Sequence, residues 1–327
     1  MLPNKVLILG KIPPPVGGVS VHVSRLVKTL VSRGFSNFHF FDFGREPISI
    51  FLVKIRQHKV IHLHTSNPYF QLIMAGYCRL TRKKLIITYH GSWGRFGFLK
   101  NRITELSAWL AFKPIVLNFE SLGKAKKRNK NTVMISAFIP PFDINPLNEG
   151  LRQTLIGFRS KYQYLFCTNS WRLTFDKDGK EIYGISGLIA NISRMSQSAL
   201  VISDPSGTNK NFFEKQLQKI PENILFITAE HDFWNILAFS DAFIRNTTTD
   251  GDSISIHEAL LLAVPVFASA NASRPAGCKL FHEVAKIDFE KELENMKLSF
   301  VQRSSLEGTA DTVGKIMQLY RNVYPDN

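Results

Sequence analysis

The sequence predicts an α/β protein of two domains, each built on a doubly wound parallel sheet. Short apolar runs alternate with amphipathic helical stretches along most of the chain, as expected for parallel strands joined by crossover helices. Pro140–Gly150 interrupts this series with two prolines and several polar residues, and a second α/β series begins after it. The length of 327 residues suits two medium-sized domains. We therefore expect one domain over 1–148, another over 149–305, and a C-terminal helix within 306–327 that crosses back to the first domain.

The first half opens with a strand over Lys5–Leu9, followed by a helix in which apolar residues recur from Val19 to Leu30. Between them lie three prolines and the pair Gly17 and Gly18. Glycines at the start of a helix let backbone amides approach a phosphate. The alternative is a turn without a ligand, and the spacing is not that of the dinucleotide-binding glycine motif. Further strands are expected at 38–43, 60–64, 85–89, 115–119 and 132–136.

The strands expected at 60–64 and 85–89 end in polar residues. Side chains at the carboxyl ends of parallel strands face the ligand crevice of the sheet. His90 is the stronger candidate for a ligand contact, because Gly91 lets a ligand come close. His62 and His64 share one face of their strand. The sequence shows no third metal ligand near them, so we expect no metal site there.

The second half repeats the alternation of strands and helices. Strands are expected at 164–168, 200–203, 224–228, 242–245 and 264–268, and helices at 182–192, 211–217, 233–239 and 254–262. A last helix is expected over 306–320. A ligand would then lie between the two halves.

The polar loop before the helix of 254–262 carries the most informative residues of this half. Asp250 lies in the loop, and Glu258 follows about two turns into the helix. Such a carboxylate suits the vicinal diol of a ribose, while the amides around Gly251, Asp252 and Ser253 suit a hydroxylated or anionic ligand. We expect Ser253 to cap the helix with its side chain. The alternative is a capped surface helix with a solvated glutamate.

Cations occur where the second series begins. Arg172 follows the first strand of this half, and Lys177 and Lys180 precede its first helix. Cations at this position could clamp a diphosphate, and the alternative is a solvated charged loop.

The formal charge of +15 indicates an anionic partner or surface. No nucleic-acid-binding motif is present, no apolar run reaches the length that spans a bilayer, and the three cysteines have no metal-ligand spacing, as in a reduced cytosolic protein. Between residues 93 and 128, aromatic side chains interleave with lysine and arginine, as on surfaces that contact anionic headgroups. The alternative is a core helix flanked by solvated charges. The residues expected to contact the membrane are Trp93, Phe96, Phe98, Lys100, Lys124, Lys126, Lys127 and Arg128.

Together these residues resemble the retaining glycosyltransferases of the GT-B fold, family 4 type. The resemblance rests on the glycine pair after the opening strand, on Tyr89-His90-Gly91, on Arg172, and on two carboxylates with seven residues between them. Two features depart from the family pattern. The first carboxylate is usually Glu and is Asp250 here, and the usual Gly-Arg-Leu…Lys-Gly cluster is reduced to Trp171-Arg172-Leu173 with displaced lysines.

The resemblance implies two Rossmann-like domains that face each other across a cleft, with the acceptor domain first and the donor domain second. It also implies a role for each candidate residue. Glu258 would hold the ribose, Arg172 with Lys177 or Lys180 the diphosphate, and Asp250 with Gly251, Asp252 and Ser253 the transferred sugar. Gly17 and Gly18 would approach the phosphate, and His90 would lie near the sugar and the leaving group.

The resulting hypothesis is a metal-independent, retaining glycosyltransferase without a cofactor, located in the cytoplasm on the inner face of the cell membrane. It would move a sugar from a nucleotide-sugar to a glycan acceptor, a polyprenyl-diphosphate-linked oligosaccharide of a bacterial O-antigen or capsule. Two alternatives are a nucleotide-sugar 2-epimerase of the same fold and a non-catalytic anion-binding protein. The sequence does not determine the donor sugar, its base, the acceptor or the oligomeric state.

Overall fold

The computed structural model describes residues 5–14, 16–176, 178–300 and 311–324, without the side chains of 298–300. The chain divides into two compact units, and each is described by itself. The first unit comprises Met1–Phe142, Asp250–Asp252 and Gly308–Asn327, and the second comprises Asp143–Thr249 and Ser253–Glu307. The first boundary, between residues 142 and 143, lies inside the proline-rich segment that the sequence marks as a linker.

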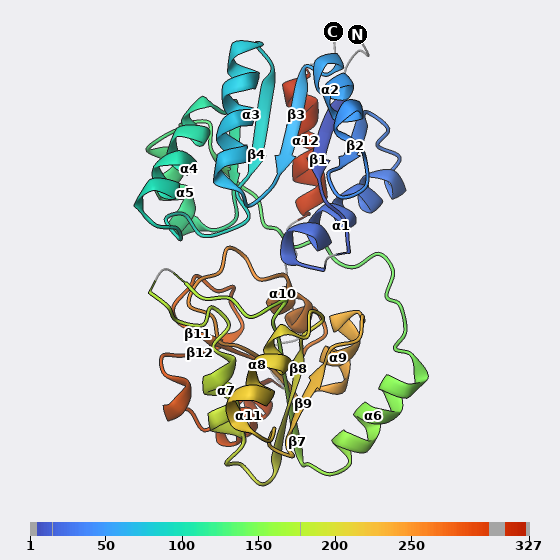
Figure 1. Cartoon of the computed structure of the whole chain (residues 1–327), viewed down its shortest axis with the longest axis vertical. Coiled ribbons are helices and arrows are strands. Elements are labelled where there is room, and N and C mark those ends of the chain that lie inside the picture. The colour runs from blue at the N-terminus through green and yellow to red at the C-terminus, as the bar shows by residue number, and fades with distance from the viewer. Residues whose placement is uncertain (1–4, 15, 177, 301–310, 325–327) are drawn as a thin grey trace. The chain divides into compact units, whose positions relative to one another are not determined.

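The first unit is built on a six-stranded sheet in the order β2-β1-β3-β4-β5-β6, and all of its pairings are parallel. Figure 1 labels the strands β1 to β4 of this sheet. The strand order reverses between β1 and β3. The chain continues from β1 to its neighbour β2 on one side, and from β3 to its neighbour β4 on the other side. Open α/β sheets bind ligands at the carboxyl ends of the strands next to such a reversal. The strands are β1 (Val6–Gly10), β2 (Phe38–Asp42), β3 (Val60–His64), β4 (Lys84–Thr88), β5 (Lys113–Val116) and β6 (Val133–Met134).

Helices cover both faces of this sheet. Side chains of a strand point alternately to its two faces, and Val6 and Ile8 of β1 pack in one core while Leu7 and Leu9 pack in another. The first core includes side chains of α1 and α12, and the second those of α2, α3 and α4. These helices are α1 (Gly18–Ser32), α2 (Ile48–Gln57), α3 (Pro68–Leu80), α4 (Phe98–Leu110), α5 (Phe119–Lys126) and α12 (Thr312–Val323).

Helix α12, in red in Figure 1, belongs to the first unit although it ends the chain. Its N-cap is Asp311, whose side chain accepts a hydrogen bond from Gly314 N at 2.9 Å and pairs with Arg33 at 2.8 Å. The sequence predicted this helix over 306–320. Residues 306–310 lie outside the described part of the chain, and the described helix continues to Val323.

The second unit contains another six-stranded parallel sheet, in the order β12-β11-β10-β7-β8-β9. Here the order reverses between β7 and β10. The strands are β7 (Tyr164–Asn169), β8 (Ser198–Ser203), β9 (Ile224–Ile227), β10 (Ala242–Arg245), β11 (Val266–Ser269) and β12 (Cys278–Phe281). The sequence did not predict β12, because this edge strand has two exposed residues and lacks the apolar run of a buried strand.

The helices of the second unit cover both faces of its sheet. Two of them, α6 and α11, were not predicted from the sequence, although Phe289, Leu293 and Met296 of α11 recur at helical spacing and pack in the core. The described helices are α6 (Glu149–Arg159), α7 (Ile185–Ile192), α8 (Thr208–Leu217), α9 (Phe233–Phe239), α10 (Ile254–Leu261), α11 (Phe289–Phe300) and the 3₁₀ helix η1 (Val284–Lys286).

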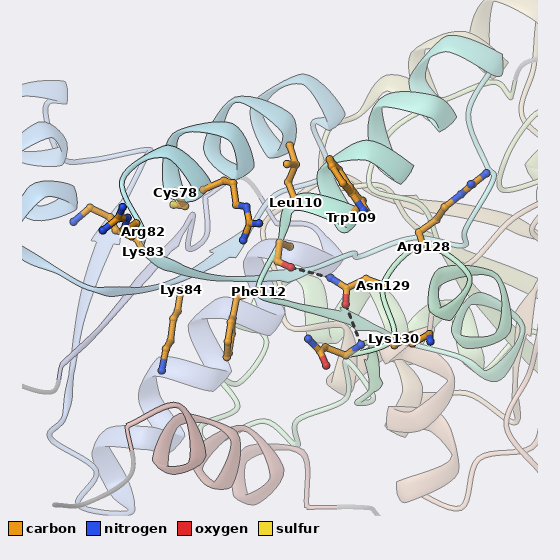
Figure 2. Close-up of a pocket in the computed structure, with 13 residues that line it drawn as sticks. Cys78, Arg82, Lys83, Lys84, Trp109, Leu110, Phe112, Arg128, Asn129 and Lys130 are labelled. Atoms are coloured by element: carbon orange, nitrogen blue, oxygen red, sulfur yellow. Dashed lines mark hydrogen bonds between the residues drawn. The ribbon is translucent and has the colours of Figure 1, made fainter.

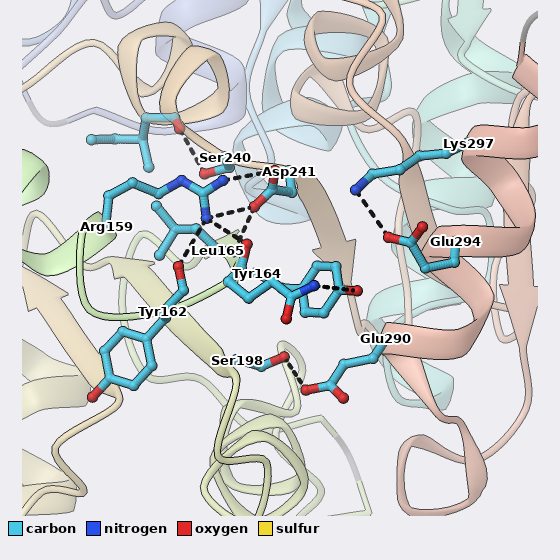
Figure 3. Close-up of polar contacts among 12 residues, drawn as sticks. Arg159, Tyr162, Tyr164, Leu165, Ser198, Ser240, Asp241, Glu290, Glu294 and Lys297 are labelled. Atoms are coloured by element: carbon cyan, nitrogen blue, oxygen red, sulfur yellow. Dashed lines mark hydrogen bonds and ion pairs between the residues drawn. The ribbon is translucent and has the colours of Figure 1, made fainter.

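An ion pair joins α6 to the sheet of the second unit (Figure 3). Arg159 Nη1 lies 2.9 Å from Asp241 Oδ2, and Arg159 Nη2 donates to Asp241 Oδ1 at 3.0 Å. Asp241 Oδ2 also accepts a hydrogen bond from Leu165 N at 2.7 Å, at the start of β7. One carboxylate thus fixes the beginning of two neighbouring strands and the end of a helix.

We expect Asp241→Ala to destabilise the second unit by about 1–3 kcal/mol, because the substitution removes the hydrogen-bond acceptor of the Leu165 amide and the ion-pair partner of Arg159. Urea unfolding followed by circular dichroism measures the change. Glu214→Ala is the control, since Glu214 pairs with Lys210 at 3.6 Å on the surface and such pairs contribute about 0–1 kcal/mol. Equal effects of the two substitutions would show that the Asp241 network does not hold the unit together.

Candidate functional site

Polar side chains at the carboxyl ends of β7 and β10 connect to the first turn of α10. Arg245 Nη1 donates to Asn169 Oδ1 at 2.9 Å, and Asn169 Nδ2 donates to Ser255 Oγ at 2.7 Å. Glu258 follows Ser255 by one turn of α10 and is only 5% exposed. A buried carboxylate therefore lies in the helix that is joined to the point where the strand order reverses. We call these residues, together with Ser253, the β7/β10 site.

Helix α10 begins where the sequence predicts, with Ser253 as its N-cap residue. The predicted cap itself is wrong, because the Ser253 side chain makes no capping hydrogen bond. Its Oγ atom is buried and has no hydrogen-bond partner among the residues that the structure describes. A buried hydroxyl without a partner is costly, and it is a group that a hydroxylated ligand would satisfy.

The predicted diphosphate-binding cations belong to the loop that follows β7. Arg172 and Lys180 are both exposed, and the loop is ordered by Asp176 Oδ1, which accepts from Lys180 N at 3.0 Å. Lys177 lies outside the described residues, so the choice between the two lysines stays a prediction. Sequence reasoning missed Arg245 and Asn169 as members of the site. The available signal was their position, since each is the last residue of its strand.

The loop Asp250–Asp252 is grouped with the first unit. Gly251 O accepts from Asn118 Nδ2 at 2.6 Å, and Ser92 Oγ donates to Asp250 O. A Cβ atom on Gly251 would lie 3.0 Å from Gly91 Cα and 3.1 Å from His90 O, so only glycine allows this close approach. The structure therefore brings together two groups of candidate residues that are about 160 positions apart in the sequence.

The glycine pair lies at the N-terminus of α1, as predicted. Gly17 is the N-cap residue, and its N–H donates to Ser20 Oγ at 3.0 Å. A Cβ atom on Gly18 would meet nothing within 4 Å, and one on Gly17 would meet only Ser20 Oγ, at 4.0 Å. Packing inside the protein therefore does not require either glycine, and the helix N-terminus is open to an approaching group.

Histidines occupy the carboxyl edge of the first sheet. His22 lies in α1, His64 ends β3 and His90 follows β4. His22 Nδ1 lies 2.7 Å from Ala137 O, and His64 Nδ1 lies 3.1 Å from His90 Nε2. Burial lowers the pKa of His22 from 6.5 to about 4, and it holds the pKa values of His64 and His90 well below 6.5. All three imidazoles are neutral at pH 7. We call these three residues the histidine edge.

His62 does not join the histidine edge, although it shares a strand face with His64. Its Nδ1 atom lies 2.6 Å from the Tyr320 hydroxyl, and its Nε2 atom lies 2.8 Å from Thr88 Oγ1. Burial lowers its pKa to about 3. Both ring nitrogens are therefore occupied by hydroxyl groups, and His62 fixes α12 to the sheet.

A hollow with a volume of about 790 Å³ lies at the amino ends of β4 and β5 in the first unit (Figure 2). Lys83 and Lys84 donate to backbone carbonyls, of His58 at 2.8 Å and of Val323 at 2.9 Å. Six cationic residues line this basic hollow, together with Trp109 and Phe112: Arg79, Arg82, Lys83, Lys84, Arg128 and Lys130. Within the described part of the chain, Arg79, Arg82 and Lys130 have no acidic partner.

The aromatic residues predicted to contact a membrane differ in exposure. Trp93 is half-buried and packs against Tyr89 with ring centroids 5.4 Å apart, and Phe96 is half-buried too. Phe98 is 77% exposed at the start of α4, and Trp109 is 64% exposed near its end. Packing in the core accounts for Trp93, whereas packing explains neither Phe98 nor Trp109.

The predicted membrane-contacting cations divide in the same way. Lys124 pairs with Glu120 at 2.6 Å, and Arg128 pairs with Glu105 at 2.8 Å. Three others are exposed: Lys100, Lys126 and Lys127. In the described residues, no helix has both the length and the apolar character needed to span a bilayer.

No known protein family matches the sequence, and no curated protein matches it either. Solved structures, however, align with almost the whole chain. HepE from Anabaena, in complex with UDP-glucose, shows 16% identity and a TM-score of 0.64 over 97% of this chain and 94% of its own. A glycosyltransferase from Rickettsia africae shows 13% identity and a TM-score of 0.64 over 99% of this chain and 100% of its own. The chain has the GT-B fold.

A further GT-B structure is WaaG, a glycosyltransferase involved in lipopolysaccharide biosynthesis, with 11% identity and a TM-score of 0.60 over 98% of this chain and 100% of its own. The fold class predicted from the sequence is therefore confirmed, including the parallel sheet in each half. At these identities, the likeness concerns the fold and not the reaction.

We expect Tyr320→Phe to lower the free energy of unfolding of the first unit by about 1–3 kcal/mol, because it leaves the fully buried His62 Nδ1 without a partner. Urea unfolding and hydrogen exchange of residues 312–323 measure the effect. Tyr324→Phe is the matched control, since that hydroxyl donates to Lys5 O at 3.2 Å from a less buried position. Unchanged exchange in α12 of the Tyr320 variant would contradict this role of the hydrogen bond.

Proposed function

We propose that this protein is a glycosyltransferase that uses a nucleotide-sugar donor, and that the donor is a UDP-sugar. The support comes from the GT-B fold over nearly the whole chain, because one structure with this fold binds UDP-glucose and two others are named glycosyltransferases. The observation that carries the proposal is the buried carboxylate of Glu258 on α10. The same helix is hydrogen-bonded, from Ser255 to Asn169, at the reversal of strand order in the second sheet. That reversal is where open α/β sheets hold nucleotides.

In this proposal Glu258 accepts hydrogen bonds from the ribose hydroxyls of the donor. Ser253 contributes its unpartnered hydroxyl, and the N-terminus of α10 contributes partial positive charge. Arg172, with Lys180 or Lys177, neutralises the diphosphate. These cations take the role of a metal ion at the leaving group, so we assign no cofactor to the reaction.

The transferred sugar would be held by Asp250, by the amides of Gly251 and Asp252, and by His90. Cleavage of the sugar–phosphate bond develops positive charge on the anomeric carbon and negative charge on the departing diphosphate. Preorganised donors aimed at such charge contribute about 3 kcal/mol each. We propose retention of configuration through front-face attack, as the resemblance to the retaining glycosyltransferases implies.

We propose that the acceptor is a lipid-linked glycan, and that the basic hollow and α4 bring the protein to an anionic membrane. Helix α4 presents Phe98 and Trp109, and Trp109 also lines the hollow with its cations. Exposed aromatic residues beside cations are the composition of membrane-surface contacts. The basic hollow lies at the amino ends of β4 and β5, whereas His90 lies just beyond the carboxyl end of β4. Because β4 has five residues, the two ends of this strand are about 17 Å apart. Membrane contact at the hollow would leave the catalytic edge accessible. A bacterial O-antigen or capsule precursor is the acceptor class that this arrangement suits.

The first prediction concerns the donor. Glu258→Gln removes the charge that accepts the ribose hydroxyls, so we expect binding of UDP-glucose to weaken roughly 100-fold, as two lost charge-assisted hydrogen bonds imply. Isothermal titration calorimetry measures the affinity, and a thermal-shift comparison of UDP, GDP, CMP and ADP tests the base.

Glu222→Gln makes the same change on an exposed residue and should leave the affinity unchanged. Unaltered UDP-glucose binding in the folded Glu258 variant would refute the ribose role. Conversion of the UDP-sugar to its epimer without an acceptor would instead identify an epimerase.

The second prediction concerns the membrane. Replacing Arg79, Arg82 and Lys130 by Gln removes three cations from the hollow, each worth about 1 kcal/mol near an anionic surface. We expect roughly 100-fold weaker binding to phosphatidylglycerol vesicles in a flotation assay, with unchanged UDP-glucose affinity. The control removes three cations from the second unit: Lys210, Lys215 and Lys219. Equal losses for both triple variants would mean that net charge, and not the hollow, drives binding.

A further inference from the structure

The imidazoles of the histidine edge form a nearly equilateral triangle. The ring centroids of His22, His64 and His90 are separated by 5.1, 5.3 and 5.3 Å. One ligand nitrogen can be chosen from each ring so that all three lie within 4.8 Å of one another. Three imidazoles that bind one tetrahedral ion at 2.0–2.1 Å would hold their centroids roughly 5 Å apart. The rings therefore have the separation that a shared ion requires.

Hydrogen bonding leaves nitrogen lone pairs free at this edge. Ala137 O can only accept, so His22 Nδ1 carries the proton and donates it at 2.7 Å. Neutral His22 therefore presents a lone pair at Nε2, and the carbonyl orients the ring as second partners of metal-bound histidines do. Among the described residues, His22 Nε2 has no hydrogen-bond partner, and His22 is only 2% exposed. Such a buried group requires an ion or a water.

The remaining pair has a contact that suits the same ion. His64 Nδ1 and His90 Nε2 are 3.1 Å apart. Two nitrogens on one tetrahedral zinc ion are roughly 3.3 Å apart, as the Zn–N distance implies. In the ion-bound form the proton shared in this contact would move away, so that His64 carries its proton on Nε2 and His90 on Nδ1. The His90 Nδ1–H group would then be a donor for the sugar contact of the proposed function.

The charges around the triangle favour one class of ion. Arg25 and Arg95 act on His22 and His90 electrostatically and oppose positive charge, whereas Asp252 favours it. No carboxylate belongs to the ligand group of histidines. Hard ions such as Mg²⁺ and Ca²⁺ need oxygen ligands, while imidazole suits zinc, copper, nickel and iron.

We propose that His22, His64 and His90 form a binding site for a divalent transition-metal ion, with Zn²⁺ as its representative. Three protein nitrogens leave a fourth position for water, the arrangement of an open zinc site. All three ligands belong to the first unit, and the proposed function assigns no metal to the diphosphate of the donor. The proposal therefore stands or falls independently of the glycosyltransferase assignment.

The test uses the full-length chain after treatment with EDTA and no nucleotide-sugar. We expect titration calorimetry with Zn²⁺ to show one ion per chain, and Co²⁺ to give the visible absorption of a tetrahedral site without a thiolate charge-transfer band. His22→Gln, His64→Gln and His90→Gln should each weaken Zn²⁺ binding more than about 100-fold, beyond the loss typical of an outer-shell partner.

His282→Gln and Cys278→Ser are the controls, because His282 is exposed and Cys278 is the one cysteine that is not fully buried among the three. Both should bind Zn²⁺ as the unmodified chain does. Failure of the unmodified chain to bind one ion would overturn the proposal, whether or not the variants fold. Binding that survives all three histidine substitutions, or a thiolate band with Co²⁺, would overturn it as well.

Discussion

Helices cover both faces of each parallel sheet, and this burial is the constraint that determines where polar chemistry can occur in the protein. Every residue of β1, β3 and β8 is buried. A polar group without a partner is costly in such a layer, so polar side chains collect where strands end. The histidine edge and the β7/β10 site are both results of this constraint, because each lies beside a reversal of strand order at the carboxyl ends.

The two strand-order reversals carry different chemistry. In the first unit, burial keeps the imidazoles of His22, His64 and His90 neutral, so this edge offers nitrogen lone pairs. In the second unit, Arg245 and Glu258 place a cation and a buried carboxylate near the same strand ends. A neutral, nitrogen-rich edge and a charged, oxygen-rich edge suit different ligands. One fold repeated in one chain thus supplies two distinct chemical environments.

Local patterns predicted the parts of the structure that depend on local forces. The bounds of β3 (Val60–His64) and β10 (Ala242–Arg245) are those predicted from the sequence, because strands buried on both faces begin with apolar residues and carry their polar residues toward the carboxyl end. The start of α10 after Ser253 was also predicted. The edge strand Cys278–Phe281 could not be found in this way, since half of it faces solvent and its partner β11 supplies the pairing.

The candidate sites show where local pattern ends. By itself, the sequence determined the two α/β series, the glycine pair before α1 and the carboxylate on α10, because strand length, helix periodicity and turn chemistry act over a few residues. Only the tertiary structure decided that His64 meets His22 and His90, and that His62 is instead bound by Tyr320, 258 positions later. These neighbours come from separate elements, and the order and register of strands that place them depend on packing across the whole sheet.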